Sequence, residues 1–165
     1  MMHTPDKNKF YIQVYTAEEF YSQYDNPADN FKDLVMQDKD YFHPTSDSYN
    51  RARKEKRVFH SVVFTRDTNT AISHVGMQPL NTSIGKVLYI FHVFTLEPYR
   101  RQGLVKYALH SLQKQGMKLG LRTASDNYKA ITLWESLGFH LSDTGVYTTE
   151  NDTELEYIWE NNSSN

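Results

Sequence analysis

Residues 88–105 read Leu88-Tyr-Ile-Phe-His-Val-Phe-Thr-Leu-Glu-Pro-Tyr-Arg-Arg-Gln-Gly-Leu-Val105 and carry the first indications of structure. The first half is rich in aromatic and β-branched residues and predicts a buried strand, and the second half predicts a tight basic turn leading into a helix. The N-terminus of a helix attracts anions because its N–H groups are unpaired and it carries a partial positive charge. Arg100 and Arg101 add full charges there, and Gly103 lets the backbone approach a ligand closely. The stretch therefore predicts a binding site for a diphosphate.

The alternative interpretation of Arg100 and Arg101 is surface charge that binds nothing. Cations at a helix N-terminus oppose the helix dipole, and a bound anion removes that conflict. The sequence therefore favours phosphate contact for this pair.

Strand and helix patterns alternate on both sides of this stretch, which predicts a mixed α/β domain. Thr16 is a candidate N-cap for a first helix, Asn26-Pro27 begins a second, and residues 43–50 are expected to be a loop. Two further helices are expected, one at 104–115 and one that begins at a cap within 125–127 and ends at Gly138. The expected strands span 10–15, 57–66, 71–80, 86–96, 119–124, 140–148 and 154–159.

Length and composition bound the class of protein. A chain of 165 residues with a net charge of −2 suits a single domain, 1–165, with a core of about 10–159 and a polar tail at 161–165. The absence of cysteine excludes disulfides, a thiol nucleophile and a cysteine-based metal site. No signal peptide or membrane-spanning run is evident, so we expect a cytoplasmic protein without membrane contact, and a homodimer is left open.

Two segments together resemble the GNAT acetyltransferase superfamily. Arg100-Arg-Gln-Gly-Leu-Val105 is similar to the family's Gln/Arg-x-x-Gly-x-Gly/Ala turn, and Asn127-Tyr-Lys-Ala-Ile-Thr-Leu-Trp-Glu-Ser-Leu-Gly-Phe139 is similar to its Asn-x-x-Ala-x-x-Leu-Tyr-x-x-Leu-Gly-Phe helix. The resemblance covers about residues 10–159. It implies a central, mostly antiparallel sheet with splayed central strands, flanked by helices.

The resemblance also implies acetyl-CoA as cosubstrate, without a metal, and a small amine or a peptide or protein amine as acceptor. The turn amides would hold the pyrophosphate, the strand edge before the turn would bind the pantetheine arm, and Asn127 would reach the same arm. The implied cofactor-binding residues are Val93, Phe94, Thr95, Arg100, Arg101, Gln102, Gly103, Leu104, Val105, Asn127 and Trp134.

Two residues depart from the family pattern. Val105 stands where glycine or alanine is usual, and Trp134 stands where the family often has a tyrosine that protonates the departing thiolate. An indole N–H is not a usable acid, so Trp134 does not inherit that role. Its helical spacing from Ala130 and Leu137 favours a core residue, with a place along the cofactor channel left open. Tyr128 and Tyr147 are substitutes on chemistry alone, and the thiolate can also leave unaided.

The attacking amine must lose a proton, and a suitably placed base assists this step. His92 and Glu97 are the candidates beside the predicted cofactor site, and His74 on the neighbouring strand is a weaker one. For His92, strand alternation favours the alternative of a satisfied buried histidine. For Glu97, the favoured alternative is a solvated turn residue. A chain of water molecules in place of a single base also fits.

The acceptor is indicated only by composition. Tyr21, Tyr24, Asp25 and Asp29 lie in helices that wall the acceptor site in this family, and they favour a cationic or aromatic amine. The basic run at 51–57 lacks interleaved aromatic residues, so a solvated linker explains it better than nucleic-acid binding.

The expected function is therefore transfer of an acetyl group from acetyl-CoA to a primary amine by direct attack in a ternary complex. The alternative is an acyl-CoA-binding module with little or no catalysis.

Overall fold

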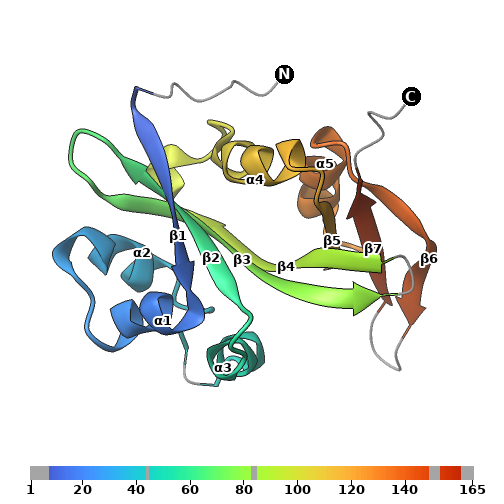
Figure 1. The fold of residues 1–165 in the computed structure, drawn as a ribbon, viewed down its shortest axis with the longest axis horizontal. Helices are drawn as coiled ribbons and strands as arrows, with labels where there is room; N and C mark the ends of the chain where they lie inside the picture. Colours follow the sequence, from blue (N-terminus) through green and yellow to red (C-terminus); the bar gives the residue numbers. More distant parts are fainter. Residues whose placement is uncertain (1–7, 44, 83–84, 149–152, 161–165) are drawn as a thin grey trace. The chain divides into compact units, whose positions relative to one another are not determined.

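The computed structural model describes residues 8–43, 45–82, 85–148 and 153–160, which form a seven-stranded sheet and the helices around it (Figure 1). The strands are β1 (Phe10–Thr16), β2 (Phe59–Thr65), β3 (Ala71–Thr82), β4 (Gly85–Thr95), β5 (Lys118–Ala124), β6 (His140–Thr148) and β7 (Thr153–Trp159). The α-helices are α1 (Ala17–Asp25), α2 (Lys32–Gln37), α3 (Asp47–Lys54), α4 (Leu104–Lys114) and α5 (Tyr128–Ser136), with short 3₁₀ helices at Asp29–Phe31 and Glu97–Tyr99.

The strand order is β1-β2-β3-β4-β5-β7-β6. The pairs β1–β2, β2–β3, β5–β7 and β6–β7 are antiparallel, and the β4–β5 pair is parallel. The expected mixed α/β class with a mostly antiparallel sheet is confirmed. The described residues fall into two compact units, one within Met1–Gln78 and Phe91–Ser111 and the other within Pro79–Ile90 and Leu112–Asn165.

In the first unit, α1, α2 and α3 lie on one side of β1 and β2, and α4 lies on the other side (Figure 1). Helix α1 begins where the sequence predicts, because the Thr16 side chain accepts from Glu19 N while the Glu19 side chain accepts from Thr16 N. The core between these helices and the strands is aromatic, with Phe20 and Phe31 each 2% exposed or less. The Phe20 ring stacks on His60 with 3.9 Å between ring centroids.

Helix α3 differs from the sequence-based expectation. The sequence predicts a loop at 43–50 and a solvated linker at 51–57, but Asp47–Lys54 is helical, with Ser46 as N-cap. The segment carries few apolar residues, so its helical period is weak, and the helix is held by tertiary contacts instead. Tyr49 is only 2% exposed and packs against Tyr21, while Arg53 pairs with Asp25.

In the second unit, β5, β7 and β6 pair as a ladder, and the first part of β4 joins β5 over Val87–Ile90. Helix α5 begins at the expected cap, because the Asn127 side chain accepts from Ala130 N at 3.2 Å. Trp134 is 6% exposed and packs on Phe139. The polar tail at 161–165, the turn at 150–152 and the Tyr147 side chain lie outside the described residues.

Among the helices that the structure describes, none has the length and apolar character that a membrane crossing requires.

Candidate active site

The turn before α4 has the backbone geometry of an anion site. Arg101 has a φ of 65° and Gly103 a φ of 74°, so two nearly adjacent residues are left-handed. Such a turn directs successive backbone N–H groups into one concavity, at a helix N-terminus that already favours negative charge. A left-handed arginine is also strained, which is characteristic of functional loops. The predicted pyrophosphate turn therefore has two left-handed residues at a helix N-terminus, a position that favours anions.

The end of β4 presents its backbone groups to two different edges. Leu96 N donates to Ile72 O at 2.8 Å, and Phe94 O accepts from the Ser73 hydroxyl at 3.1 Å, so these two residues face β3. By strand alternation, Val93 and Thr95 direct their backbone groups to the opposite edge. Of the three predicted pantetheine contacts, the geometry suits Val93 and Thr95 better than Phe94.

Arg100 folds back over the end of β4. Its Nε donates to Thr95 O at 2.9 Å, and its guanidinium lies over the Phe94 ring, 5.6 Å from the ring centroid. This bond uses one of the five guanidinium N–H donors. Arg100, Phe94 and Glu97 line an open pocket of about 410 Å³ together with Met36, Gln37 and Lys39 from the end of α2. Glu97 is therefore an exposed pocket residue.

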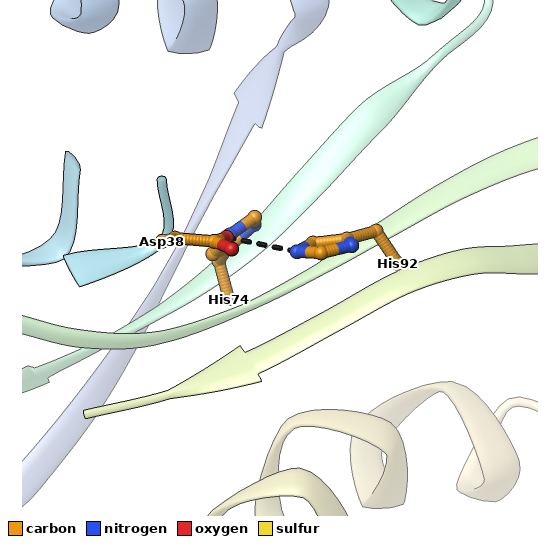
Figure 2. Close-up of side chains that lie close together, drawn as sticks. All are labelled: Asp38, His74 and His92. Carbon is orange, nitrogen blue, oxygen red and sulfur yellow. Dashed lines mark hydrogen bonds and ion pairs between the residues drawn. The ribbon is translucent and has the colours of Figure 1, made fainter. Parts of the chain in front are cut away.

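A buried carboxylate joins two histidines beside this pocket. Asp38 follows α2, His74 lies on β3 and His92 lies on β4, and both histidine Nε2 atoms are 2.8 Å from Oδ2 of Asp38 (Figure 2). Asp38 is 3% exposed and His74 is fully buried, whereas the His92 side chain is 22% exposed. The Tyr41 ring stacks on the His92 ring at 4.0 Å. The His92 imidazole is therefore held by two contacts and is partly exposed.

The hydrogen bonds continue inward from His74. His74 Nδ1 lies 3.3 Å from His60 Nδ1, His60 Nε2 lies 2.9 Å from the Tyr21 hydroxyl, and that hydroxyl lies 2.6 Å from the Tyr41 hydroxyl. We call this series of hydrogen-bonded residues the histidine network. It consists of His92, Asp38, His74, His60, Tyr21 and Tyr41.

Burial and hydrogen bonding fix the charge states in the histidine network. Burial raises the pKa of Asp38, but the hydrogen bonds from His74 and His92 outweigh it, so the pKa of Asp38 lies below its usual value. Burial lowers the pKa of His60 well below 6.5 and that of His74 to about 4. Burial also raises the pKa values of Tyr21 and Tyr41. At neutral pH the network thus holds one anion, Asp38, among neutral buried rings.

Three of the predicted residues, Asn127, Tyr128 and Trp134, lie in the second unit. Asn127 is an exposed N-cap whose Oδ1 is engaged with Ala130 N, and its amide nitrogen is not part of that bond. Tyr128 is 74% exposed on the first turn of α5. Trp134 is a core residue, as the alternative interpretation of its spacing predicted.

Two results differ from the sequence-based interpretation of the acceptor region. Tyr21 is 2% exposed and belongs to the histidine network, while Asp25 and Asp29 are paired with Arg53 and Lys32. These residues therefore give little support to a cationic acceptor.

Asp38 is a site residue that sequence reasoning missed. The run Asp38-Lys-Asp40 resembles a solvated surface, and the two histidines that bind Asp38 lie 36 and 54 residues away. No local signal along the chain could have identified it.

Comparisons with known proteins agree with this fold. The family model described as Acetyltransferase (GNAT) family matches residues 13–139. No curated protein matches the chain by sequence. Among solved structures, Arabidopsis thaliana NAA60 in complex with acetyl-CoA is 14% identical, with a TM-score of 0.63 over 93% of this chain and 99% of that chain.

Two bacterial enzymes are similar to the same degree. A mutant of spermidine N-acetyltransferase SpeG from Vibrio cholerae is 15% identical, with a TM-score of 0.62 over 96% of this chain and 100% of that one. The ribosomal-protein-S18-alanine N-acetyltransferase from Escherichia coli is 18% identical, with a TM-score of 0.59 over 92% and 93%. At these identities the structures establish the fold, and the family model, which spans most of the sequence, establishes the family. The chain belongs to the acetyltransferase (GNAT) family.

Proposed function

We propose that the protein transfers an acetyl group from acetyl-CoA to a primary amine by direct attack in a ternary complex. The observation that carries this proposal is the turn before α4, where Arg101 and Gly103 are both left-handed at a helix N-terminus, a place and a kind of turn that favour anion binding. In this assignment the turn residues Arg101–Val105 hold the pyrophosphate, with Arg100 beside them. Val93 and Thr95 bind the pantetheine arm from the edge of β4.

The proposal also assigns roles to two residues at and within α5. Asn127 has an amide nitrogen outside its capping bond, and we assign that group to the pantetheine arm. Trp134 supports α5 from the core and is not assigned to the chemistry.

His92 is the proposed base. The amine nitrogen attacks the thioester carbonyl carbon, a C–N bond forms, the C–S bond breaks and CoA leaves as a thiolate. The amine must lose a proton in this sequence, and His92 accepts it as a partly exposed imidazole that an ionised carboxylate orients. Glu97 is the second candidate because it lines the pocket beside Arg100. No acid is assigned to the thiolate, since a CoA thiol has a pKa near that of a cysteine, about 8.5.

Thiol release from acetyl-CoA with an amine panel tests the proposal. The panel contains spermidine and peptides with different free N-terminal residues, since the similar structures are named for acceptors of both kinds. We expect acetyl-CoA-dependent thiol release with at least one primary amine, and none with its N-acetylated form. Tight CoA binding without turnover across the panel would instead support an acyl-CoA-binding module.

A further inference from the structure

The histidine network contains enough hydrogen bonds to define where each proton lies. Asp38 is an anion and only accepts, so His74 and His92 both donate from Nε2. His74 is neutral, so its Nδ1 carries a lone pair and must accept from His60 Nδ1. His60 Nε2 is then the acceptor for the Tyr21 hydroxyl.

The hydrogen bond between the Tyr41 and Tyr21 hydroxyls is the last one in the histidine network. Because the Tyr21 hydroxyl donates to His60, its oxygen accepts from the Tyr41 hydroxyl. Every donor in the series is used once. Four of the five bonds run from Tyr41 towards Asp38, and the fifth runs from His92 to Asp38. No other arrangement of neutral histidines around an ionised Asp38 satisfies all of these contacts.

We propose that His74, His60, Tyr21 and Tyr41 are positioning residues, which hold Asp38 ionised and aimed at His92 so that Nδ1 of His92 is the atom that accepts the proton of the amine. This inference rests on the proposed function for the reaction, but its prediction of tautomers does not. In the neutral form of His92, donation of Nε2–H to Asp38 leaves the lone pair on Nδ1. Tyr41 supports the same ring from its face, so one residue closes the chain and also fixes the base.

A metal site is the competing interpretation of Asp38, His74 and His92, whose ligand atoms lie within 4.8 Å of one another. The ligands of a tetrahedral zinc ion, bound at about 2.0–2.1 Å, lie roughly 3.3 Å apart. The two N–O distances here are 2.8 Å, which is the length of a hydrogen bond. The geometry therefore favours protons between these atoms.

Histidine tautomers measured by ¹⁵N NMR at neutral pH test the proposal directly. We expect Nε2–H for His92 and His74 and Nδ1–H for His60. Finding Nδ1–H on His92 would overturn the proposal whether or not the protein acetylates any amine.

A pair of substitutions at His74 tests the positioning role. His74→Gln keeps an N–H donor at about the place of Nε2, whereas His74→Leu removes it. For the leucine variant we expect kcat to fall on the order of tenfold or more, KM for acetyl-CoA to stay the same, and the His92 signals to shift towards mixed tautomers. The glutamine variant should retain most of kcat and the Nε2–H form of His92.

Circular dichroism and thermal unfolding confirm that both His74 variants are folded. Equal kcat and equal His92 signals in two folded variants would reject the positioning role. Absence of transferase activity in the unsubstituted protein would reject the proposed function and leave the tautomer result standing. Stoichiometric Co²⁺ binding with the absorption bands of a tetrahedral site would assign the cluster to a metal and overturn the network.

Discussion

At the scale of single residues, two side chains compete for the role of base. His92 has an ionised partner in Asp38 and a ring fixed by Tyr41, whereas Glu97 stands in an open pocket lined by Lys39 and Arg100. An orienting carboxylate matters because it holds the imidazole in the tautomer and rotamer that the reaction needs.

We therefore expect His92→Gln to lower kcat by about 10²-fold, and Asp38→Asn to lower it by a smaller factor, both without loss of CoA affinity. Glu97→Gln should stay within about threefold of the parent. Asp40→Asn is the matched control for Asp38→Asn, because Asp40 is an exposed carboxylate two residues away. Steady-state kinetics and calorimetric CoA titration give the result. A Glu97→Gln variant that is slower than His92→Gln would assign the base to Glu97.

At the scale of elements, the sequence predicted most of what local patterns determine. The β2–β3 and β6–β7 hairpins and the caps of α1 and α5 follow from alternation and from Thr16 and Asn127. Helix α3 was missed because Tyr49 and Ala52, its buried residues, are too few to create a clear period. Its stability depends on aromatic neighbours elsewhere in the chain.

The candidate site also contains parts that local sequence patterns predict and parts that they do not. The turn before α4 was predictable as a turn because its signal is contiguous: two arginines, a glycine and an apolar helix start. Its role in binding an anion stays a prediction. His92 was predictable as a candidate only, since its role depends on Asp38, which is brought to it by folding across 54 residues. A pattern read along the chain contains no information on such a contact.

The turn gives a prediction of its own, based on two glycines with nearly equal backbone angles. Gly103 has a φ of 74° at the start of α4, and Gly116 has a φ of 75° just beyond its end. Alanine at either position costs about 1–2 kcal/mol of stability, because a Cβ is disfavoured in the left-handed region. Only Gly103→Ala changes the backbone that we propose holds the pyrophosphate, so we expect it alone to weaken CoA binding, by about tenfold.

Urea unfolding and calorimetric CoA titration measure the two effects separately. Gly116→Ala serves as the control for the loss of stability. If the two variants are equally destabilised and bind CoA with equal affinity, the assignment of the pyrophosphate site to this turn is wrong.

At the scale of the whole molecule, the histidine network places a carboxylate and two imidazoles, those of Asp38, His60 and His74, in the core of the first unit. A buried histidine that stays neutral in the folded protein makes stability depend on pH, because the same ring takes up a proton in the unfolded chain. The pKa of His74 is lowered by burial to about 4, and that of His60 is lowered well below 6.5 for the same reason. The loss of stability from these rings therefore appears only in acid.

The number of protons bound by the folded and unfolded states determines whether stability rises or falls with pH. Both histidines have depressed pKa values, so their contribution to stability is fully present above pH 6.5. Between pH 6.5 and about 4 the unfolded chain binds more protons than the folded one, and the free energy of unfolding falls as pH falls. Each histidine adds a slope of up to about 1.4 kcal/mol per pH unit in that window. Asp38, whose pKa is also lowered, extends the loss to lower pH.

Urea unfolding at intervals from about pH 7.5 to about pH 4.5 measures this slope. His60→Leu removes one of the two rings, so we expect its free energy of unfolding to depend less steeply on pH than the parent's. The difference in slope corresponds to at most one bound proton. The variant is also less stable at neutral pH. Val62→Ala, a fully buried position on the same strand, should lower stability at every pH and leave the slope unchanged. If His60→Leu keeps the parent's slope while Val62→Ala behaves as expected, His60 is not held neutral in the folded state. The direction of the hydrogen bonds from Tyr41 to Asp38 would then be wrong as well.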